Sequence, residues 1–443
     1  MSPAPTEIAS YTIADRVAAA RSTVGTWLSK VFMAVMDQGL ISGSNFVLGI
    51  LLARWLSAEQ YGAFALAFSI FLLISQFYSS LLLEPMAVFG GSSYRYRQQG
   101  YLGALLWIHL GSALAVFLVL GISAGVAQTF HVGGNLPSAL TAVTVAGPCI
   151  LLFWLVRRAF YLELSPAPAV LGALFYCALV LGGLFVVYRR GWLSAFSAFL
   201  LMAVGALLTS ILSLLRLKPN LRLRNASPSL QETWQQHWSY GRWALATSAL
   251  LWMPSNIYFP VISSFSGLAR AGELKALINL TLPIANVATA LSLLFQTYAS
   301  RIHHQHGAGR LRTFAGKVTL LYASGGIIYW ILLVAFREQV VHFLYGGNYQ
   351  NLAPLVPWLA FASILQMSIA GPTMSLRAME SPASVFVAYC ASSAVSFFVG
   401  IPLAWRFGVR GVLLAMMASS FTGLVTSYIL LKRRGGGIRE AIA

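Results

Sequence analysis

Residues 101–127 read YLGALLWIHLGSALAVFLVLGISAGVA and contain no Asp, Glu, Lys or Arg. An α-helix rises about 1.5 Å per residue, so roughly 20 apolar residues cross a hydrocarbon core of about 30 Å. Eleven further apolar stretches have a comparable length, and they are too long and too uniform for the alternating strands of a membrane barrel. We therefore predict twelve transmembrane helices, near residues 32–53, 60–84, 101–127, 138–160, 167–188, 191–215, 239–264, 275–300, 315–336, 352–376, 383–405 and 409–431.

The bulk composition supports a protein that is solvated by lipid. Hydrophobic residues make up 58% of the chain and charged residues only 9%, against about 25% charged residues in a soluble domain. The formal net charge is +18, but no soluble basic domain is present that would bind nucleic acid. The excess instead fits loops that face anionic membrane lipids.

The positive charges also predict an orientation. Twelve helices place both ends of the chain on one side, and the tails and loops of that side carry 21 of the 29 Lys and Arg residues. Because basic residues collect in cytoplasmic loops, we predict that both termini are cytoplasmic. Arg189 and Arg190 fall on the outer side and do not follow the rule.

A polar linker near the middle of the chain divides it into two halves of six helices. We predict the following segments: an amphipathic N-terminal segment at 1–31, helix bundles at 32–215 and 239–431, the linker at 216–238, and a basic tail at 432–443. LTSIL at 208–212 and VTSYI at 425–429 hold matching places in the two halves. Unless this is chance similarity between apolar helices, it indicates a parallel repeat with a two-fold axis along the membrane normal.

Three segments resemble a known family. Residues 37–66 begin with DQGLISGSNF and continue from Leu51 as LLARWLSAEQYGAFAL, residues 343–351 read FLYGGNYQN, and residues 408–412 read GVRGV. They resemble the first hairpin, the loop before the tenth helix and the start of the last helix of bacterial polysaccharide-lipid flippases. This family belongs to the multidrug/oligosaccharidyl-lipid/polysaccharide exporter superfamily. The motifs are loose, and they mark the fold better than the substrate.

The resemblance implies an all-α fold of two six-helix bundles around a central cavity. It also implies a function in the bacterial inner membrane, the flipping of polyprenyl-diphosphate-linked oligosaccharide repeat units. Such flipping serves the biosynthesis of exopolysaccharide, capsule or O-antigen, the polysaccharide part of lipopolysaccharide. The implied pathway partners are a polysaccharide polymerase and glycosyltransferases. No ATPase domain is implied, and the sequence has no GxxxxGK[ST] motif.

Polar residues recur at helical spacing on the first two helices of each half. Such stripes either line a cavity or pack helices against one another. A polar cavity would spare the sugar hydroxyls burial in hydrocarbon, and Arg would grip the diphosphate. Arg242 and Arg377 would do this, unless they snorkel to lipid headgroups. The candidates for the substrate cavity are Gln38, Asn45, Arg54, Gln76, Arg242, Asn256, Tyr258, Asn286, Gln296 and Arg377.

Two carboxylates, Asp37 and Glu84, are candidates for coupling a proton or a cation, because ionisable residues within spans are usually functional. Salt bridges with Arg54, Arg95 or Arg97 are the alternative. The RIHHQH stretch at 301–306 is predicted to be a solvated loop, since no carboxylate lies near it to complete a metal site. We expect no metal and no cofactor.

Two other functions remain open. A cation-coupled multidrug antiporter of the same superfamily would favour several buried carboxylates, whereas only Asp37 is clearly mid-span here. A membrane-embedded polysaccharide polymerase would carry a large outer loop, and the predicted outer loops are short. The sequence has no catalytic triad, paired carboxylates or nucleophile elbow. It therefore predicts a transporter rather than an enzyme.

Overall fold

The computed structural model describes residues 13–130, 134–163, 165–222, 228–379 and 381–436, without some of the side chains, chiefly those of residues 13–28. In this part of the chain every regular element is helical, so the predicted all-α class is confirmed. Three short helical segments lie between the α-helices: η1 (Ser79–Leu83) and η3 (Ser396–Gly400) are π-helical, and η2 (Gln350–Leu355) is a 3₁₀ helix. The α-helices are α1 (Ile13–Trp55), α2 (Ala58–Tyr78), α3 (Glu84–Phe89), α4 (Gln98–Thr129), α5 (Leu136–Leu162), α6 (Ala167–Arg189), α7 (Ala195–Leu217), α8 (Leu230–Asn256), α9 (Tyr258–Ser266), α10 (Leu268–Asn279), α11 (Leu282–Ala335), α12 (Arg337–Tyr345), α13 (Val356–Ser368), α14 (Ala370–Ala378), α15 (Pro382–Val395) and α16 (Ile401–Gly436).

Membrane spans make up most of the described chain. Nine helices are long and apolar enough to cross a bilayer, and the bent pair Leu268–Asn279 and Leu282–Ser292 makes a tenth. One of the nine, Ala383–Arg434, covers the last two predicted spans. The α8–α9 pair matches the predicted span 239–264, although α8 is too polar to be among the nine. Counted in this way, the described helices accommodate the twelve predicted spans.

Two glycines turn helices that continue without a loop. α11 changes direction at Gly307 (φ 71°, ψ −173°) and α16 at Gly408 (φ 58°, ψ −134°), conformations that a residue with a Cβ rarely adopts. Beyond Gly307 the chain runs back along itself, and the Tyr322 hydroxyl donates to the Ala288 carbonyl over 2.9 Å. Residues 301–306 belong to α11 and are helical, so the prediction of a loop there was wrong.

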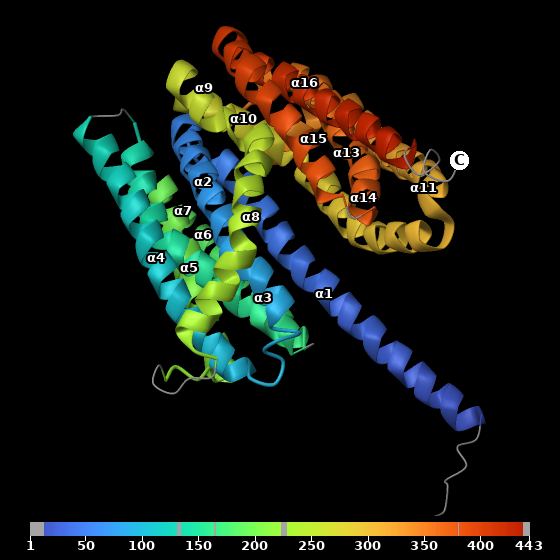
Figure 1. Ribbon diagram of the computed structural model, residues 1–443. Helices are drawn as coiled ribbons and strands as arrows, with labels where there is room; N and C mark the ends of the chain where they lie inside the picture. Colours follow the sequence, from blue (N-terminus) through green and yellow to red (C-terminus); the bar gives the residue numbers. More distant parts are fainter. Residues whose placement is uncertain (1–12, 131–133, 164, 223–227, 380, 437–443) are drawn as a thin grey trace, which may run out of the picture.

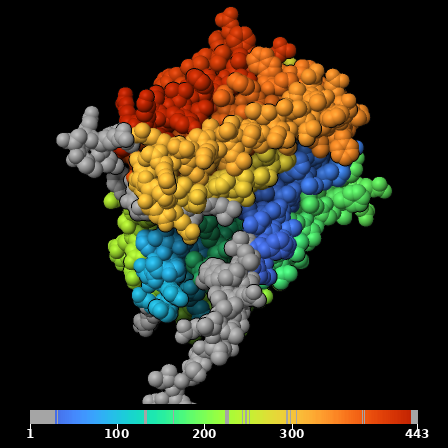
Figure 2. Space-filling view, turned by 90° about the vertical axis from the view of Figure 1, so that its right-hand side faces the viewer, coloured from blue at the N-terminus to red at the C-terminus, as the bar shows by residue number. Residues whose placement is uncertain are grey.

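The helices form two bundles, with α1 running diagonally between them (Figure 1). In the N-terminal bundle α5 packs on α4 and α7, while α6 packs on α1 and α7. In the C-terminal bundle α11 packs on α13 and α14, and α15 packs on α16. In a view turned by 90°, the C-terminal bundle (gold to red) lies above the N-terminal bundle (blue to green) (Figure 2). The predicted two-bundle architecture is confirmed.

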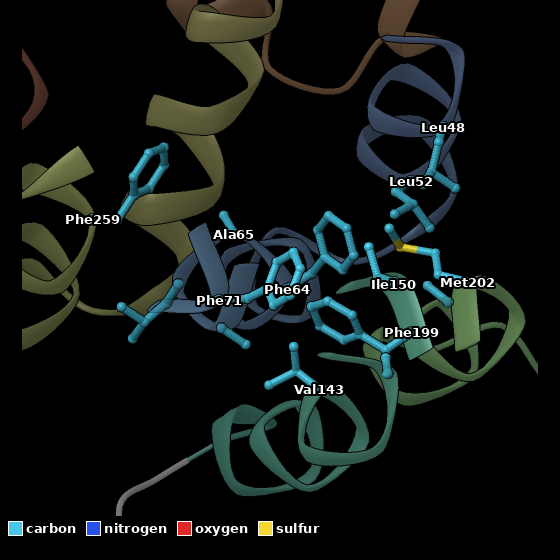
Figure 3. Packing of buried hydrophobic residues seen from close by; sticks show 14 of the residues in the cluster. Leu48, Leu52, Phe64, Ala65, Phe71, Val143, Ile150, Phe199, Met202 and Phe259 are labelled. Atoms are coloured by element: carbon cyan, nitrogen blue, oxygen red, sulfur yellow. The ribbon is translucent and has the colours of Figure 1, made fainter. Parts of the chain in front are cut away.

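Aromatic and aliphatic side chains of α2 pack against α5 and α7 in the N-terminal bundle. Phe64 of α2 stacks on Phe199 of α7 with ring centroids 4.7 Å apart. Val143 and Ile150 of α5 pack into the same apolar cluster (Figure 3). Because lipid tails are as apolar as these side chains, the stabilisation here comes from close packing more than from the exclusion of water.

Two helices begin earlier than the sequence predicts. α1 is continuous from Ile13, so residues 13–31 of the predicted amphipathic segment extend the first span, while residues 1–12 lie outside the described residues. α8 begins at Leu230, inside the predicted linker 216–238. The Ser229 hydroxyl caps it by accepting a hydrogen bond from the Glu232 amide over 3.1 Å.

A histidine of α8 bonds to the π-helical segment η1. In η1 the Glu84 amide donates to the Ser79 carbonyl five residues earlier, and Pro85 has no N–H to continue this ladder. The His237 Nδ1–H of α8 donates to the nearby Leu81 carbonyl over 2.9 Å, and the Tyr101 hydroxyl of α4 lies 2.7 Å from His237 Nε2. These partners assign the neutral imidazole, with Nε2 accepting from Tyr101. The resulting network ties η1, α4 and α8 together at a buried point.

The His237 network predicts a pH dependence of stability. His237 lies just outside the predicted span, and burial lowers the pKa of its imidazole to about 4, against about 6.5 in an unfolded chain. Between pH 6.5 and 4 the unfolded state therefore binds more protons, and stability falls as the pH falls. We expect the melting temperature in detergent to fall over this range. The slope should be shallower in His237→Gln, and it should keep its wild-type value in His342→Gln, which alters an exposed histidine. Equal slopes in wild type and His237→Gln would contradict the assignment.

Candidate functional site

Asp37 lies at the centre of a buried polar cluster between α1 and α5. Its carboxylate is fully buried and accepts two hydrogen bonds from Arg157 Nε, at 2.9 and 2.8 Å. An Nη atom of Arg157 lies 2.8 Å from the same carboxylate and donates to the Gln38 amide oxygen over 3.1 Å. The Tyr161 hydroxyl, one helical turn beyond Arg157, donates a short hydrogen bond to Asp37. The carboxylate is thus held as an ion with each oxygen satisfied.

Arg157 was missed as a site residue by the sequence analysis. The partners proposed there for Asp37 were Arg54, Arg95 and Arg97, and the structure pairs Asp37 with Arg157 instead. A signal was present, because Arg157 lies inside the predicted span 138–160, where a charge needs a partner. The sequence could not indicate which helix supplies that partner.

Four of the predicted cavity residues have exposed side chains within spans: Gln38 and Asn45 of α1, Gln76 of α2 and Asn286 of α11. An amide that faces hydrocarbon would lose its hydrogen bonds at a cost of several kcal/mol. The exposed amides are therefore the candidates for a water-facing side of these helices. They come from both bundles, as expected of two halves that face one another.

The two bundles are in close contact at one end, where α2 meets α10. A Cβ on Gly62 would lie 1.7 Å from the Leu268 carbonyl oxygen, and one on Gly272 would lie 2.6 Å from that of Ala58. The Asn279 amide donates to the Tyr61 hydroxyl over 2.8 Å inside this contact. We call it the α2–α10 contact. It closes the space between the bundles at this end, which is the outer end in the predicted orientation.

Arg54 belongs to this closed end and not to the group of exposed amides. An Nη of Arg54 donates to the Phe343 carbonyl over 3.4 Å, and the Asn348 amide donates to the Arg54 carbonyl over 3.1 Å. The end of α12 and the turn after it, which together carry most of the FLYGGNYQN motif, therefore bind the end of α1. The structure separates Arg54 from Asp37, which lies more than four helical turns away along α1.

The remaining candidates occupy several environments. Tyr258 is buried with its hydroxyl against Gly400, and Gln296 donates to the Met374 carbonyl over 3.3 Å, so both pack within the C-terminal bundle. Asn256 is half-buried and donates to the Trp252 carbonyl over 3.4 Å. Three charged candidates are exposed: Glu84 at the start of α3, Arg242 in the middle of α8, and Arg377 in the last turn of α14. Because α8 begins at Leu230, the expected position of Arg242 near a helix end was wrong.

A second polar space was not predicted from the sequence. It is a cavity of about 120 Å³ inside the C-terminal bundle. Its polar lining is uncharged and includes Gln366, Thr373, Ser392 and Ser427. Hydroxyls scattered along apolar helices gave no periodic signal that would have identified it.

No protein-family model matches the sequence, and no curated protein is similar to it. Solved structures share its fold. An inward-facing multidrug resistance MATE family transporter of the MOP superfamily has a TM-score of 0.73 at 14% identity, covering 92% of this chain and 96% of that one. An outward-facing multidrug resistance MATE family transporter of the MOP superfamily has a TM-score of 0.64 at 13% identity, covering 94% of this chain and 96% of that one. The lipid II flippase MurJ, in an inward closed conformation, scores 0.67 at 13% identity, covering 91% and 87%. The chain therefore has the fold of MOP superfamily transporters and is an integral membrane protein.

The α2–α10 contact predicts a way to open the closed end. Gly62→Leu places a side chain where the Leu268 carbonyl lies, so the two helices must separate. With the three native cysteines replaced and spin labels at Glu59→Cys and Ser266→Cys, pulsed electron spin resonance should show longer distances than in wild type. Gly182→Leu, where a Cβ meets no atom within 4 Å, is the matched control. Unchanged distances in a folded Gly62→Leu protein would show that close packing does not hold this end closed.

Proposed function

We propose that this protein flips polyprenyl-diphosphate-linked oligosaccharides across the bacterial inner membrane by alternating access, with both termini in the cytoplasm. The product would serve the biosynthesis of exopolysaccharide, capsule or O-antigen, alongside a polymerase and glycosyltransferases. The observation that carries the proposal is the saturation of Asp37 by Arg157 and Tyr161. With its single fully buried carboxylate neutralised, the described site attracts anionic or neutral groups more than cations.

The chemistry of the substrate supports this choice. A diphosphate is stabilised by guanidinium groups, which donate in a planar fork. Arg157 keeps 17% of its side chain exposed beside Gln38. Arg242 in the middle of α8 and Arg377 in the last turn of α14 are exposed. Sugar hydroxyls would replace water on the exposed amides of Gln38, Asn45, Gln76 and Asn286 at little cost. MurJ, which shares the fold, is named as a lipid II flippase.

A cation-coupled multidrug antiporter is the second candidate. The MATE structures that share this fold are named as multidrug resistance transporters. Asp37 also lies inside the first span, where ionisable residues are usually functional. On this hypothesis the Asp37–Arg157 pair would couple ion movement to the opening of the bundles.

Reconstituted liposomes distinguish the two functions. The substrate is a fluorescent polyprenyl-diphosphate oligosaccharide, and its appearance in the second leaflet is measured with an impermeant quencher. We expect wild type to transfer it. Arg157→Gln should be at least ten times slower, because the site loses its buried guanidinium, while Arg189→Gln, which alters an exposed arginine at the far end of α6, should match wild type. No transfer by wild type, together with dye movement driven by a proton or sodium gradient, would overturn the flippase proposal.

A double substitution separates folding from function. Asp37→Asn alone leaves the half-buried Arg157 without its counter-ion, and breaking a buried pair on one side typically destabilises a protein by up to about 3–5 kcal/mol. We expect a lower melting temperature in detergent for Asp37→Asn. The double variant Asp37→Asn with Arg157→Gln keeps neutral hydrogen-bonding groups and should recover much of this loss, but not the transfer of substrate. If the double variant transferred substrate at the wild-type rate, the Asp37–Arg157 pair would not belong to the substrate site.

A further inference from the structure

A deep apolar groove runs along the N-terminal bundle between α2, α4 and α8. Its volume is about 770 Å³, and its walls include Ile74, Phe77, Leu81, Ile108, Val116 and Trp234. This volume is large enough for a hydrocarbon chain to lie between the helices, in addition to the lipid that covers the outer surface.

The groove is separate from the exposed amides. Successive residues of an α-helix are turned by about 100°, so Ile74, Tyr78 and Leu81 share one face of α2 and η1, and Gln76 points away from it. The groove is lined by the first group and not by Gln76. α2 thus stands between the groove and the candidate substrate site.

The polar groups at the groove are already paired. The Tyr78 hydroxyl is 2.9 Å from His109 Nδ1, and the Ser112 hydroxyl donates to the Ile108 carbonyl over 2.9 Å. The Trp107 indole N–H donates to the Leu221 carbonyl over 3.2 Å. Gln231 is the one further polar side chain in the lining, and it is exposed. Because the other polar groups are satisfied within the protein and the remaining walls are apolar, the groove favours an apolar occupant over a polar one.

One end of the groove lies against a basic segment. The chain after α7 is fixed on α4 through its backbone. The Asn220 backbone N–H donates to the Gln99 carbonyl over 3.0 Å, and the Asn220 backbone carbonyl packs on Gly103. The bond from Trp107, which lines the groove, to Leu221 places this segment beside one end of the groove, and the segment carries the exposed cations Lys218 and Arg222. An anionic headgroup would be attracted there.

The length of the groove fits a single leaflet. Trp107 and Val116 lie at two points of its α4 wall, and nine residues of helix between them rise about 14 Å. This is roughly half of a hydrocarbon core of about 30 Å. The groove therefore extends from the basic mouth, where tryptophans lie, towards the middle of the membrane.

We propose that this groove is a binding site for an anionic phospholipid, which places an acyl chain along α4 and its phosphate at Lys218 and Arg222. An acyl chain is preferred to the isoprenoid tail of a transported substrate, because α2 separates the groove from the exposed amides. The bound lipid would fill the space between α2, α4 and α8 and hold the basic segment in place.

Native mass spectrometry of the detergent-purified protein tests the site, with phosphatidylglycerol and phosphatidylcholine as probes. We expect wild type to retain one phosphatidylglycerol at least ten times more strongly than phosphatidylcholine. Gly111→Leu and Ala115→Phe fill the groove and should abolish this retention. Gly125→Leu is the matched control, because it adds a side chain at another exposed glycine of α4 outside the groove. Melting temperatures establish that each variant is folded.

A second pair of variants tests the headgroup site without altering the groove. Lys218→Gln with Arg222→Gln should reduce the preference for phosphatidylglycerol to less than twofold, while Arg337→Gln with Arg406→Gln should preserve it. Wild-type retention by the groove-filling variants would overturn the proposal. Displacement of phosphatidylglycerol by polyprenyl phosphate at equal concentration would also overturn it, since the groove would then belong to the substrate.

Discussion

Hydrocarbon offers no hydrogen-bond partners, and this constraint determines how the polar groups of the structure are arranged. Asp37 is buried only because Arg157 and Tyr161 saturate its carboxylate. The Leu81 carbonyl of η1 receives the His237 imidazole from another helix. The Gln76 and Asn286 amides are exposed, and water is a better solvent for them than hydrocarbon. Paired polar groups thus join helices.

Much of the fold follows from the sequence because the relevant signals are local. A run of apolar residues predicts a span whatever its neighbours are, so the helical class and the two bundles were predictable. The helix hairpins were harder to predict, because Gly307 and Gly408 turn α11 and α16 without a polar loop that would mark the turn. The polar sequence at 301–306 was read as a loop for the same reason.

The site was less predictable because it depends on pairs of helices. The exposed amides of α1, α2 and α11 were found by their helical spacing, which is again a local signal. The partner of Asp37 was not found, since Arg157 is separated from it by 120 residues and nothing in the sequence indicates which faces of α1 and α5 meet. Arg54 was grouped with the cavity because it is charged, whereas its role in the structure comes from a loop nearly 290 residues further along.

The helix α8 follows the linker in sequence, yet most of its length is bonded to the N-terminal bundle. Ser248 lies within hydrogen-bond distance of Ser80, and the Trp252 indole donates to the Ser69 carbonyl over 3.0 Å. Between these two contacts, the Ser393 hydroxyl of α15 donates to the Leu250 carbonyl over 2.8 Å. Within little more than one helical turn, α8 is therefore bonded to both bundles. A movement of one bundle against the other would therefore have to break at least one of these three bonds.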